Sequence, residues 1–327
     1  MPGLDLPLND YLRPGFRLGR YAIVRRLSAG GYGAVYLARR QDGKLVALKE
    51  FLPRLMACRR PEDKGLVRPQ TPSAAKSFQH GLRVFFREAE ILAKIHDDRV
   101  IAVWDVFEAN GTAYFAMPVE RGLTLQAAIA FAPQPLTDRV VRNLLIDACR
   151  GVEALHRHGL LHLDLKPHNL WLRPDGTVVV LDLGASRWAG EEGGGASLVR
   201  TPGYAAPEQH GAVQVGALNE RTDVYGLAAT FRTAVESARP PAAPQRRLKA
   251  LDFFKRRLGQ RDRGLLAVLD RGMALRPEDR WQTVADMRHA LERSPVPTDM
   301  DVVRADGLGA SRAIRPLSVG VDVAGVV

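Results

Sequence analysis

Residues 162–169, which read HLDLKPHN, place an acid, a cation and an amide within one short stretch of the chain. The carboxylate of Asp164 can accept the proton of an attacking hydroxyl group, and the ammonium of Lys166 can neutralise charge on a phosphate. The amide of Asn169 can help to bind a divalent metal ion. Because these three groups must meet at one place, the segment predicts a loop at a site for phosphoryl transfer.

A second acidic segment follows at residues 178–184, which read VVVLDLG. Its apolar run predicts a strand of a hairpin, turning at residues 174–176 (PDG), that brings Asp182 next to Asp164. The two segments resemble the catalytic loop and the metal-binding motif of the protein kinases, in particular the bacterial Ser/Thr type. The resemblance implies a bilobal α+β fold, with a small, mainly β N-lobe, a larger, mainly α C-lobe, and ATP in the cleft between them.

Residues 21–51 contain three apolar runs separated by turn residues, which predicts three antiparallel strands. The turn at residues 28–35 (SAGGYGAV) is rich in glycine, so its N–H groups can approach phosphates. Such a turn alone is weak support, because most are simple hairpins, but Lys49 follows on the third run, as in the kinase signature. Ser28 stands where the family has its first glycine, so we expect reduced nucleotide affinity.

A further strand is predicted at residues 113–117, followed by a segment that resembles the kinase hinge. Met117 would then lie at the back of the adenine pocket. Because Pro118 has no N–H group, adenine would bind its carbonyl and the N–H of Glu120. The resemblance assigns nucleotide contacts to Ser28, Gly30, Gly31, Gly33, Val35, Ala47, Lys49, Met117, Pro118, Glu120 and Asn169.

Apolar residues at helical spacing predict a helix over residues 84–95. Within it, Glu88 matches the family's glutamate that pairs with the strand lysine, here Lys49. Glu90 is the alternative partner, and a solvated glutamate without a catalytic role is the other interpretation of Glu88.

The domain boundaries follow from the same patterns. Residues 1–17 are predicted to be a loose arm, residues 18–117 the N-lobe, and residues 118–292 the hinge and C-lobe. An insertion at about residues 53–81 is longer than the family's usual link, and we expect a surface feature that packs over the following helix or presents a regulatory surface. Residues 293–327 are predicted to be disordered, with a β-prone docking tail as the alternative.

In the C-lobe, apolar spacing predicts a helix from Asp138 to His158, with Thr137 as its N-cap. This helix would lead into the catalytic loop. His156 and His158 are interpreted as ordinary histidines at the C-terminal end of a helix, and His162 as a packing residue of the loop.

Residues 200–208 (RTPGYAAPE) resemble the segment that closes the kinase activation loop. Within it, Thr201 occupies the position at which kinases of the Ser/Thr type carry a threonine. Phosphotransferases that act on small molecules lack this segment, so the resemblance implies a protein substrate. It also implies that Asp223 binds the backbone of the catalytic loop and that Arg280 pairs with Glu208.

Leu163 occupies the position where many kinases carry an arginine that binds a phosphate on the activation loop. Leucine has no charge and no donor, so a phosphate on Ser197 or Thr201 would lack this partner, and Arg200 or Arg187 would have to replace it. We therefore expect the loop to need no phosphate.

The composition is that of a globular protein: of 327 residues, 46% are hydrophobic and 25% are charged. The net charge of +11 is spread along the chain, so we expect no specific nucleic-acid partner. Apolar runs fall short of the roughly 20 residues that span a bilayer, and the N-terminus is unlike a signal peptide. We therefore expect no membrane span and a cytoplasmic location.

The resemblance implies transfer of the γ-phosphoryl group of ATP, bound with Mg²⁺ or Mn²⁺, to serine or threonine hydroxyls of proteins in bacterial signalling. The expected catalytic residues are Asp164, Lys166, Lys49 and Glu88, and the expected metal ligands are Asn169 and Asp182. The alternative is a pseudokinase that binds nucleotide or partners and regulates without chemistry, which the departures at Ser28 and Leu163 favour.

Overall fold

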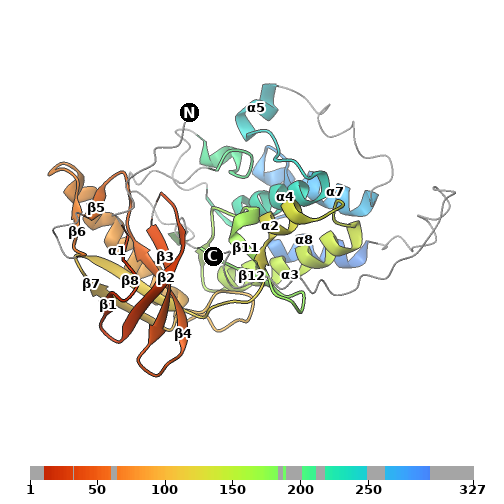
Figure 1. Cartoon of the computed structure of the whole chain (residues 1–327). Coiled ribbons are helices and arrows are strands. Elements are labelled where there is room, and N and C mark those ends of the chain that lie inside the picture. The colour runs from red at the N-terminus through yellow and green to blue at the C-terminus, as the bar shows by residue number, and fades with distance from the viewer. Residues whose placement is uncertain are drawn as a thin grey trace. The chain divides into compact units, whose positions relative to one another are not determined.

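The computed structural model describes residues 11–31, 33–59, 65–182, 187–188, 201–210, 218–248 and 262–294. These residues form two compact units, which divide between Arg121 and Gly122 (Figure 1). The first unit consists of a β-sheet, a short hairpin and one long helix, and the second is mainly helical. The chain thus has the bilobal α+β kinase fold that the sequence predicts.

The sheet of the first unit has six antiparallel strands in the order β1-β2-β3-β4-β8-β7. Their bounds are Arg17–Leu18 (β1), Tyr21–Ala29 (β2), Gly33–Arg40 (β3), Leu45–Phe51 (β4), Asp105–Ala109 (β7) and Thr112–Met117 (β8). The three strands predicted within residues 21–51 are confirmed as β2, β3 and β4. Strand β7 was not predicted. Its signal is the pair Asn110-Gly111, which turns the β7–β8 hairpin with φ angles of 51° and 71°.

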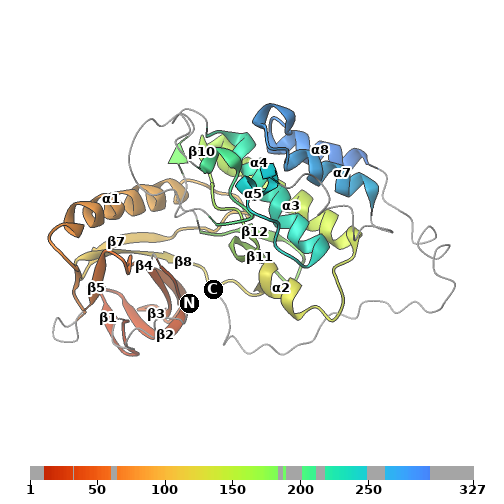
Figure 2. The same ribbon diagram turned by 90° about the horizontal axis from the view of Figure 1, so that it is seen from above.

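Helix α1 (Ala74–Leu92) covers one face of this sheet and runs along β7 and β8 (Figure 2). Phe78 and Phe85 of the helix contact Phe51 of β4, with ring centroids 5.6 and 5.4 Å apart. Phe85 also stacks on Phe115 of β8 at 5.0 Å. This aromatic cluster holds the helix on the sheet by burying large apolar surfaces.

The helix begins at Ala74, not at residue 84 as the sequence suggested. Gly81, at the end of the predicted insertion, lies inside the helix. A Cβ atom at this position would lie 2.7 Å from the Phe51 ring, so the glycine lets the helix approach the sheet closely. The insertion is therefore limited to about residues 53–73.

The opposite face of the sheet is covered by the segment that precedes β1. Leu12 is 5% exposed, and its N–H donates to the hydroxyl of Tyr36 at 3.3 Å. Phe16 packs against the same cluster. Residues 11–17 are thus packed, where the sequence predicted a loose arm, because an irregular segment can bury single side chains without any periodicity. Residues 1–10 lie outside the described ranges.

A buried polar network lies on this second face. Glu50 of β4 is fully buried, and its carboxylate accepts hydrogen bonds from Arg59, Tyr114 and, at 2.7 Å, Tyr36. Burial and the nearby carboxylate raise the pKa of both tyrosines, so their hydroxyls remain donors. Arg59 is 4% exposed and forms an ion pair with Glu50. The sheet therefore depends on an arginine that the insertion contributes.

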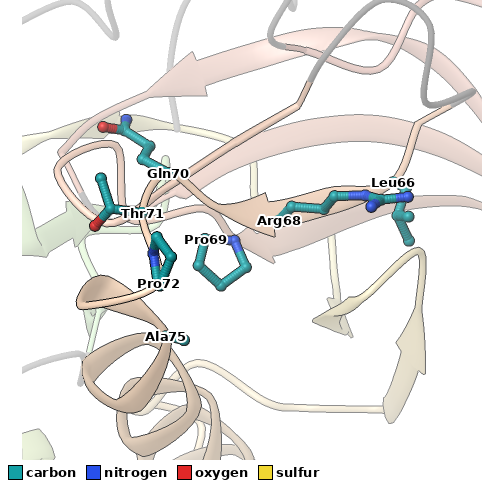
Figure 3. A pocket seen from close by; sticks show the side chains of 7 residues that line it. All are labelled: Leu66, Arg68, Pro69, Gln70, Thr71, Pro72 and Ala75. Atoms are coloured by element: carbon teal, nitrogen blue, oxygen red, sulfur yellow. The ribbon is translucent and has the colours of Figure 1, made fainter.

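That arginine ends β5 (Ala57–Arg59), which pairs with β6 (Val67–Pro69) in a hairpin before α1. The sequence predicted a surface feature here, and the burial of Arg59 corrects this prediction. A hollow lies where β6 meets the start of α1 (Figure 3). The hollow is lined by Leu66, Arg68, Pro69, Gln70, Thr71, Pro72 and Ala75. β6 contacts α1, in line with the predicted packing of the insertion on the helix.

In the second unit, helix α3 (Asp138–Arg157) confirms the predicted helix and its cap, since Thr137 Oγ1 accepts from the N–H of Val140 at 3.4 Å. It packs against α4 (Glu220–Glu236) and α8 (Val284–Arg293). The other helices described in this unit are α2 (Leu125–Phe131), α5 (Ala243–Leu248) and α7 (Arg263–Gly272). None of the helices in the described ranges is long and apolar enough to cross a bilayer.

Short strands of the second unit carry the loop with Asp164. The strands β9 (Leu123–Thr124), β11 (Leu170–Leu172) and β12 (Val178–Val180) form one sheet, and β10 (Leu160–Leu161) pairs with β13 (Arg187–Trp188). β11 and β12 are the hairpin that the sequence predicted around residues 174–176.

A buried ion pair fixes α3 to the helices that follow it. Arg142 of α3 is 2% exposed and binds Asp262, the N-cap residue of α7. Its guanidinium also donates to the carbonyl of Leu291 at 2.6 Å. One arginine therefore joins α3, α7 and α8, and the desolvated charge needs its partner.

Candidate active site

Asp164 lies in the loop between β10 and the 3-10 helix η3 (Pro167–Asn169), and it is 9% exposed. Its Oδ2 accepts from Lys166 Nζ at 2.5 Å, and its Oδ1 accepts from the hydroxyl of Thr201 at 2.7 Å. Lys166 Nζ lies 3.4 Å from the same hydroxyl. The loop thus brings a carboxylate, an ammonium and an aliphatic hydroxyl together, and the sequence pointed to all three residues.

Asn169 is buried beside Asp164, and its Nδ2 donates to the backbone carbonyl of Asp164 at 2.9 Å. This contact fixes the orientation of the amide and leaves Oδ1 as the atom that can bind a cation. Asp182 supplies a second oxygen donor, and oxygen ligands of this kind suit Mg²⁺. The N–H of Leu181, next to Asp182, donates to the Asn169 carbonyl at 2.9 Å. The two residues therefore fit the proposed metal site; Leu183 and Gly184 of the motif lie outside the described ranges.

The loop backbone is held by Asp223 of α4, which is 1% exposed. Its Oδ2 and Oδ1 accept from the N–H groups of His162 and Leu163, each at 2.8 Å. The ring of His162 is fully buried, and its Nε2 lies 3.0 Å from the carbonyl of Leu181. Asp223 therefore binds the loop as the sequence predicted, and His162 links the loop to the end of β12.

His156 has a role that the sequence does not predict. Its side chain is 5% exposed, and its Nε2 lies 2.8 Å from Asp223 Oδ2. Burial alone would lower the pKa of His156, but the hydrogen bond to Asp223 and the carboxylate of Glu220, 3.6 Å away, outweigh it and raise the pKa to about 9. The cation in turn helps to hold the pKa of Asp223 below its usual range despite burial. His156 is thus a charged partner of Asp223, and not an ordinary histidine at a helix end.

This pair should make stability depend on pH. Because the pKa of His156 is raised in the folded state, its stabilisation is fully present below the ordinary value of 6.5 and is lost as the pH rises through about 9. We expect urea denaturation to show a free energy of unfolding that falls over this range by up to about 3 kcal/mol. His156→Asn should weaken this dependence of stability on pH, because an asparagine side chain does not titrate.

His158 provides the matched control, since it lies at the same helix end, is exposed, and contacts the carbonyl of Ala154 at 2.9 Å. His158→Asn should keep the pH dependence of the wild type. If His156→Asn and the wild type lost stability equally between pH 6.5 and 9, the charged pair would not be the cause.

The segment that carries Thr201 is fixed at its other end by Glu208. Arg280 donates to the two oxygens of Glu208 at 2.7 and 2.8 Å, and Thr222 Oγ1 donates to Glu208 Oε1 at 3.0 Å. Arg280 is fully buried and Glu208 is 8% exposed. The predicted pair between Glu208 and Arg280 is confirmed; most of the preceding loop, with Ser197 and Arg200, lies outside the described residues.

In the first unit, four of the predicted nucleotide residues, Val35, Ala47, Lys49 and Met117, share one face of the sheet. Cross-strand partners point to the same side, and Val35 of β3 faces Lys49, which in turn faces Phe115. Lys49 Nζ lies 5.4 Å from the centroid of the Phe115 ring. Ala47 pairs with Met117 in a neighbouring row, and Pro118 and Glu120, both half-buried, follow directly.

Glu88 lies on the buried side of α1 and is 5% exposed, whereas Glu90 is exposed. Phe85, one turn before Glu88, stacks on the same Phe115 ring that Lys49 contacts. The helix therefore presents Glu88, and not Glu90, to the face of the sheet that carries Lys49.

The glycines of the predicted phosphate loop differ in their surroundings. A Cβ atom at Gly33 would lie 2.1 Å from the carbonyl oxygen of Glu50, so this glycine permits close contact between β3 and β4. Gly30 and Gly31 have open space where a Cβ would lie. Ser28 belongs to β2, pairs with Val35, and is not among the residues with positive φ, so serine fits this position without backbone strain.

Comparison with known proteins agrees with this geometry. A family model described as "Protein kinase domain" matches residues 21–260, which is more than half of the chain. The chain belongs to the protein kinase family.

Its relatives include bacterial kinases of two stated specificities. "Serine/threonine-protein kinase PknB" of Mycobacterium tuberculosis is 30% identical over 225 residues, covering 64% of this chain and 35% of that protein. "Serine/threonine-protein kinase Pkn1" of Myxococcus xanthus is 28% identical over 306 residues, covering 85% of this chain and 38% of that protein. "Tyrosine-protein kinase MasK" of Myxococcus xanthus is 27% identical over 327 residues, covering 89% of this chain and 45% of that protein.

The solved structure named "PpkA-294 apo form" is similar with a TM-score of 0.76 and 30% identity, and the match covers 86% of this chain and 99% of that chain. By contrast, the chain spans less than half the length of the three curated relatives.

Proposed function

We propose that this chain is an active kinase that transfers the γ-phosphoryl group of ATP to serine and threonine hydroxyls of proteins, in bacterial signalling. The observation that carries the proposal is the Thr201 hydroxyl, 2.7 Å from Asp164 Oδ1 and 3.4 Å from Lys166 Nζ. An aliphatic hydroxyl therefore fits beside a base and a cation, as attack on a phosphate requires.

In the proposed reaction, the substrate oxygen forms a bond to the γ-phosphorus while the bond to the bridging oxygen of ADP breaks. Asp164 accepts the hydroxyl proton, Lys166 stabilises charge on the transferred group, and Lys49 binds the phosphates of the nucleotide. A bound Mg²⁺ or Mn²⁺, held by Asn169 and Asp182, would neutralise the charge of the phosphates. Adenine would contact Ala47 and Met117 and bind the backbone of residues 118–120.

A pseudokinase that binds nucleotide without chemistry is the second candidate. Ser28 and Leu163 are the departures from the family pattern that favour it. The negative φ of Ser28 reduces the weight of the first departure. The proximity of Asp164, Lys166 and Asn169 favours catalysis.

The test is incubation of the full chain with labelled ATP, Mg²⁺ or Mn²⁺, and three acceptor peptides that differ only in carrying Ser, Thr or Tyr. We expect label on the Ser and Thr peptides. The rate of Asp164→Ala should be lower than that of the wild type by at least about a hundredfold, because the base is lost. Nucleotide binding without transfer would overturn the proposal in favour of a pseudokinase. Transfer to the Tyr peptide alone would overturn the Ser/Thr specificity. The Tyr peptide is included because one relative, MasK, is named a tyrosine-protein kinase.

A further inference from the structure

Leu163, the residue that precedes Asp164, has an unusual backbone conformation. Leu163 has a φ of 65°, in the left-handed region that leucine rarely adopts, and its side chain is 4% exposed. Such a conformation costs about 1 kcal/mol or more and persists only where neighbouring groups hold it. The groups that hold Leu163 therefore determine where Asp164 lies.

Two side chains bind the backbone of Leu163 from opposite sides. Asp223 accepts its N–H, as described above, and Gln209 Nε2 donates to its carbonyl oxygen at 2.8 Å. Gln209 follows Glu208 in the 3-10 helix η4 (Pro207–Gln209) and is 2% exposed. Its Oε1 accepts from the N–H of Ala206 at 2.9 Å, so both ends of the amide are bound and its orientation is fixed.

We infer that Gln209 is a positioning residue for Asp164, a role that rests on the proposed kinase function. The carbonyl of Leu163 and the N–H of Asp164 belong to one peptide group, so a rotation of that group would displace the Asp164 carboxylate. Residues 201–210 thus make two contacts that hold the base, one from Gln209 to the carbonyl of Leu163 and one from Thr201 to the carboxylate of Asp164.

Both of these contacts use neutral donors, and neither involves a phosphate. Leu163 itself is apolar and buried, so it offers no charge for a phosphate to bind. The positioning of Asp164 by residues 201–210 should therefore be complete in a chain without phosphorylation. An amide hydrogen bond to a buried backbone carbonyl is also shielded from salt, unlike an exposed ion pair.

A merely structural role for Gln209, through its bond to Ala206, makes a different prediction. An ionised glutamate at this position could still accept from the N–H of Ala206, but it could not donate to the carbonyl of Leu163. Gln209→Met has a similar size and loses both bonds. Gln209→Glu therefore isolates the contact with the catalytic loop.

The experiment uses the full chain after phosphatase treatment, with mass spectrometry to confirm that it is unmodified. Rates are measured against ATP and a Ser peptide for the wild type, Gln209→Met and Gln209→Glu at several pH values, together with melting temperatures. We expect kcat to fall by about ten- to a hundredfold in both variants, while the KM for ATP changes little, because small displacements of a catalytic group are costly. Gln209→Glu should recover part of this loss as the pH falls, because the protonated acid can donate again.

Gln282→Met is the matched control. Gln282 is exposed, and its Nε2 donates to the carbonyls of Glu278 and Arg280 at 3.2 and 2.8 Å, so the change removes amide hydrogen bonds far in sequence from the loop. It should leave kcat unchanged. If the wild type is active and Gln209→Glu has the same kcat, the positioning role alone is overturned. A loss of kcat in Gln209→Glu that does not change with pH and only parallels the fall in melting temperature would overturn it as well. An inactive wild type would overturn the proposed kinase function and this role with it.

Discussion

Replacing Lys49 by methionine or Asp182 by asparagine should lower the rate of phosphoryl transfer by about a hundredfold or more in each case. Methionine can keep the contact of residue 49 with Phe115 while it removes the charge that we propose to bind phosphates. Asparagine keeps the shape of residue 182, which is exposed, and should weaken the binding of the metal ion that we propose Asp182 to hold. Both variants should therefore fold, and initial rates with labelled ATP measure the loss.

The two losses should not add, because both residues serve one transition state. The double variant should be about as slow as the slower single one. Lys44→Met and Asp175→Asn are suitable controls, since both residues are exposed in turns of the hairpins that carry Lys49 and Asp182. A variant of Lys49 or Asp182 that kept a near wild-type rate would remove the role proposed for that residue.

The second large effect concerns stability. Arg59→Met should lower the free energy of unfolding by about 3–5 kcal/mol, because it leaves the carboxylate of Glu50 buried without its counterion. The hydroxyls of Tyr36 and Tyr114 would remain as donors, but they carry no charge. Urea denaturation of the full chain, followed by a probe in the first unit, measures the change.

Replacing both partners, as in Glu50→Leu with Arg59→Met, should restore part of the loss, since no unpaired buried charge remains. Arg20→Met is the control on the same sheet. Arg20 is 53% exposed and lies 2.6 Å from Asp105, so its loss should leave the free energy of unfolding almost unchanged. Equal effects of Arg20→Met and Arg59→Met would show that burial adds nothing to the Glu50 pair.

The fold and the central groups of the candidate site could be predicted from the sequence because they are encoded locally. Asp164, Lys166 and Asn169 lie within six residues, and one loop brings them together. The strands of residues 21–51 and helix α3 follow from periodicity and from the cap at Thr137.

The residues that were missed act through partners far along the chain. His156 binds Asp223 across 67 positions, and Gln209 binds Leu163 across 46. Neither contact leaves a pattern in a single sequence. The pairing of Arg59 with Glu50 could not be predicted for another reason. In an irregular segment, the sequence does not show whether an arginine is buried or exposed. The apolar spacing predicts the helix only from residue 84, whereas α1 begins at Ala74 and contains Gly81, which lets it pack closely on Phe51.

The long-range ion pairs also set the limits of a recombinant protein. A chain trimmed to the family match at residues 21–260 would discard Leu12, Asp262 and Arg280, together with helices α7 and α8. Arg142 would lose its buried ion pair with Asp262, Glu208 would lose its buried ion pair with Arg280, and Leu12 would no longer cover its face of the sheet. Such a fragment should aggregate or be degraded, although its catalytic motifs would be complete. Cloning limits drawn at residues 11 and 294 keep every one of these partners.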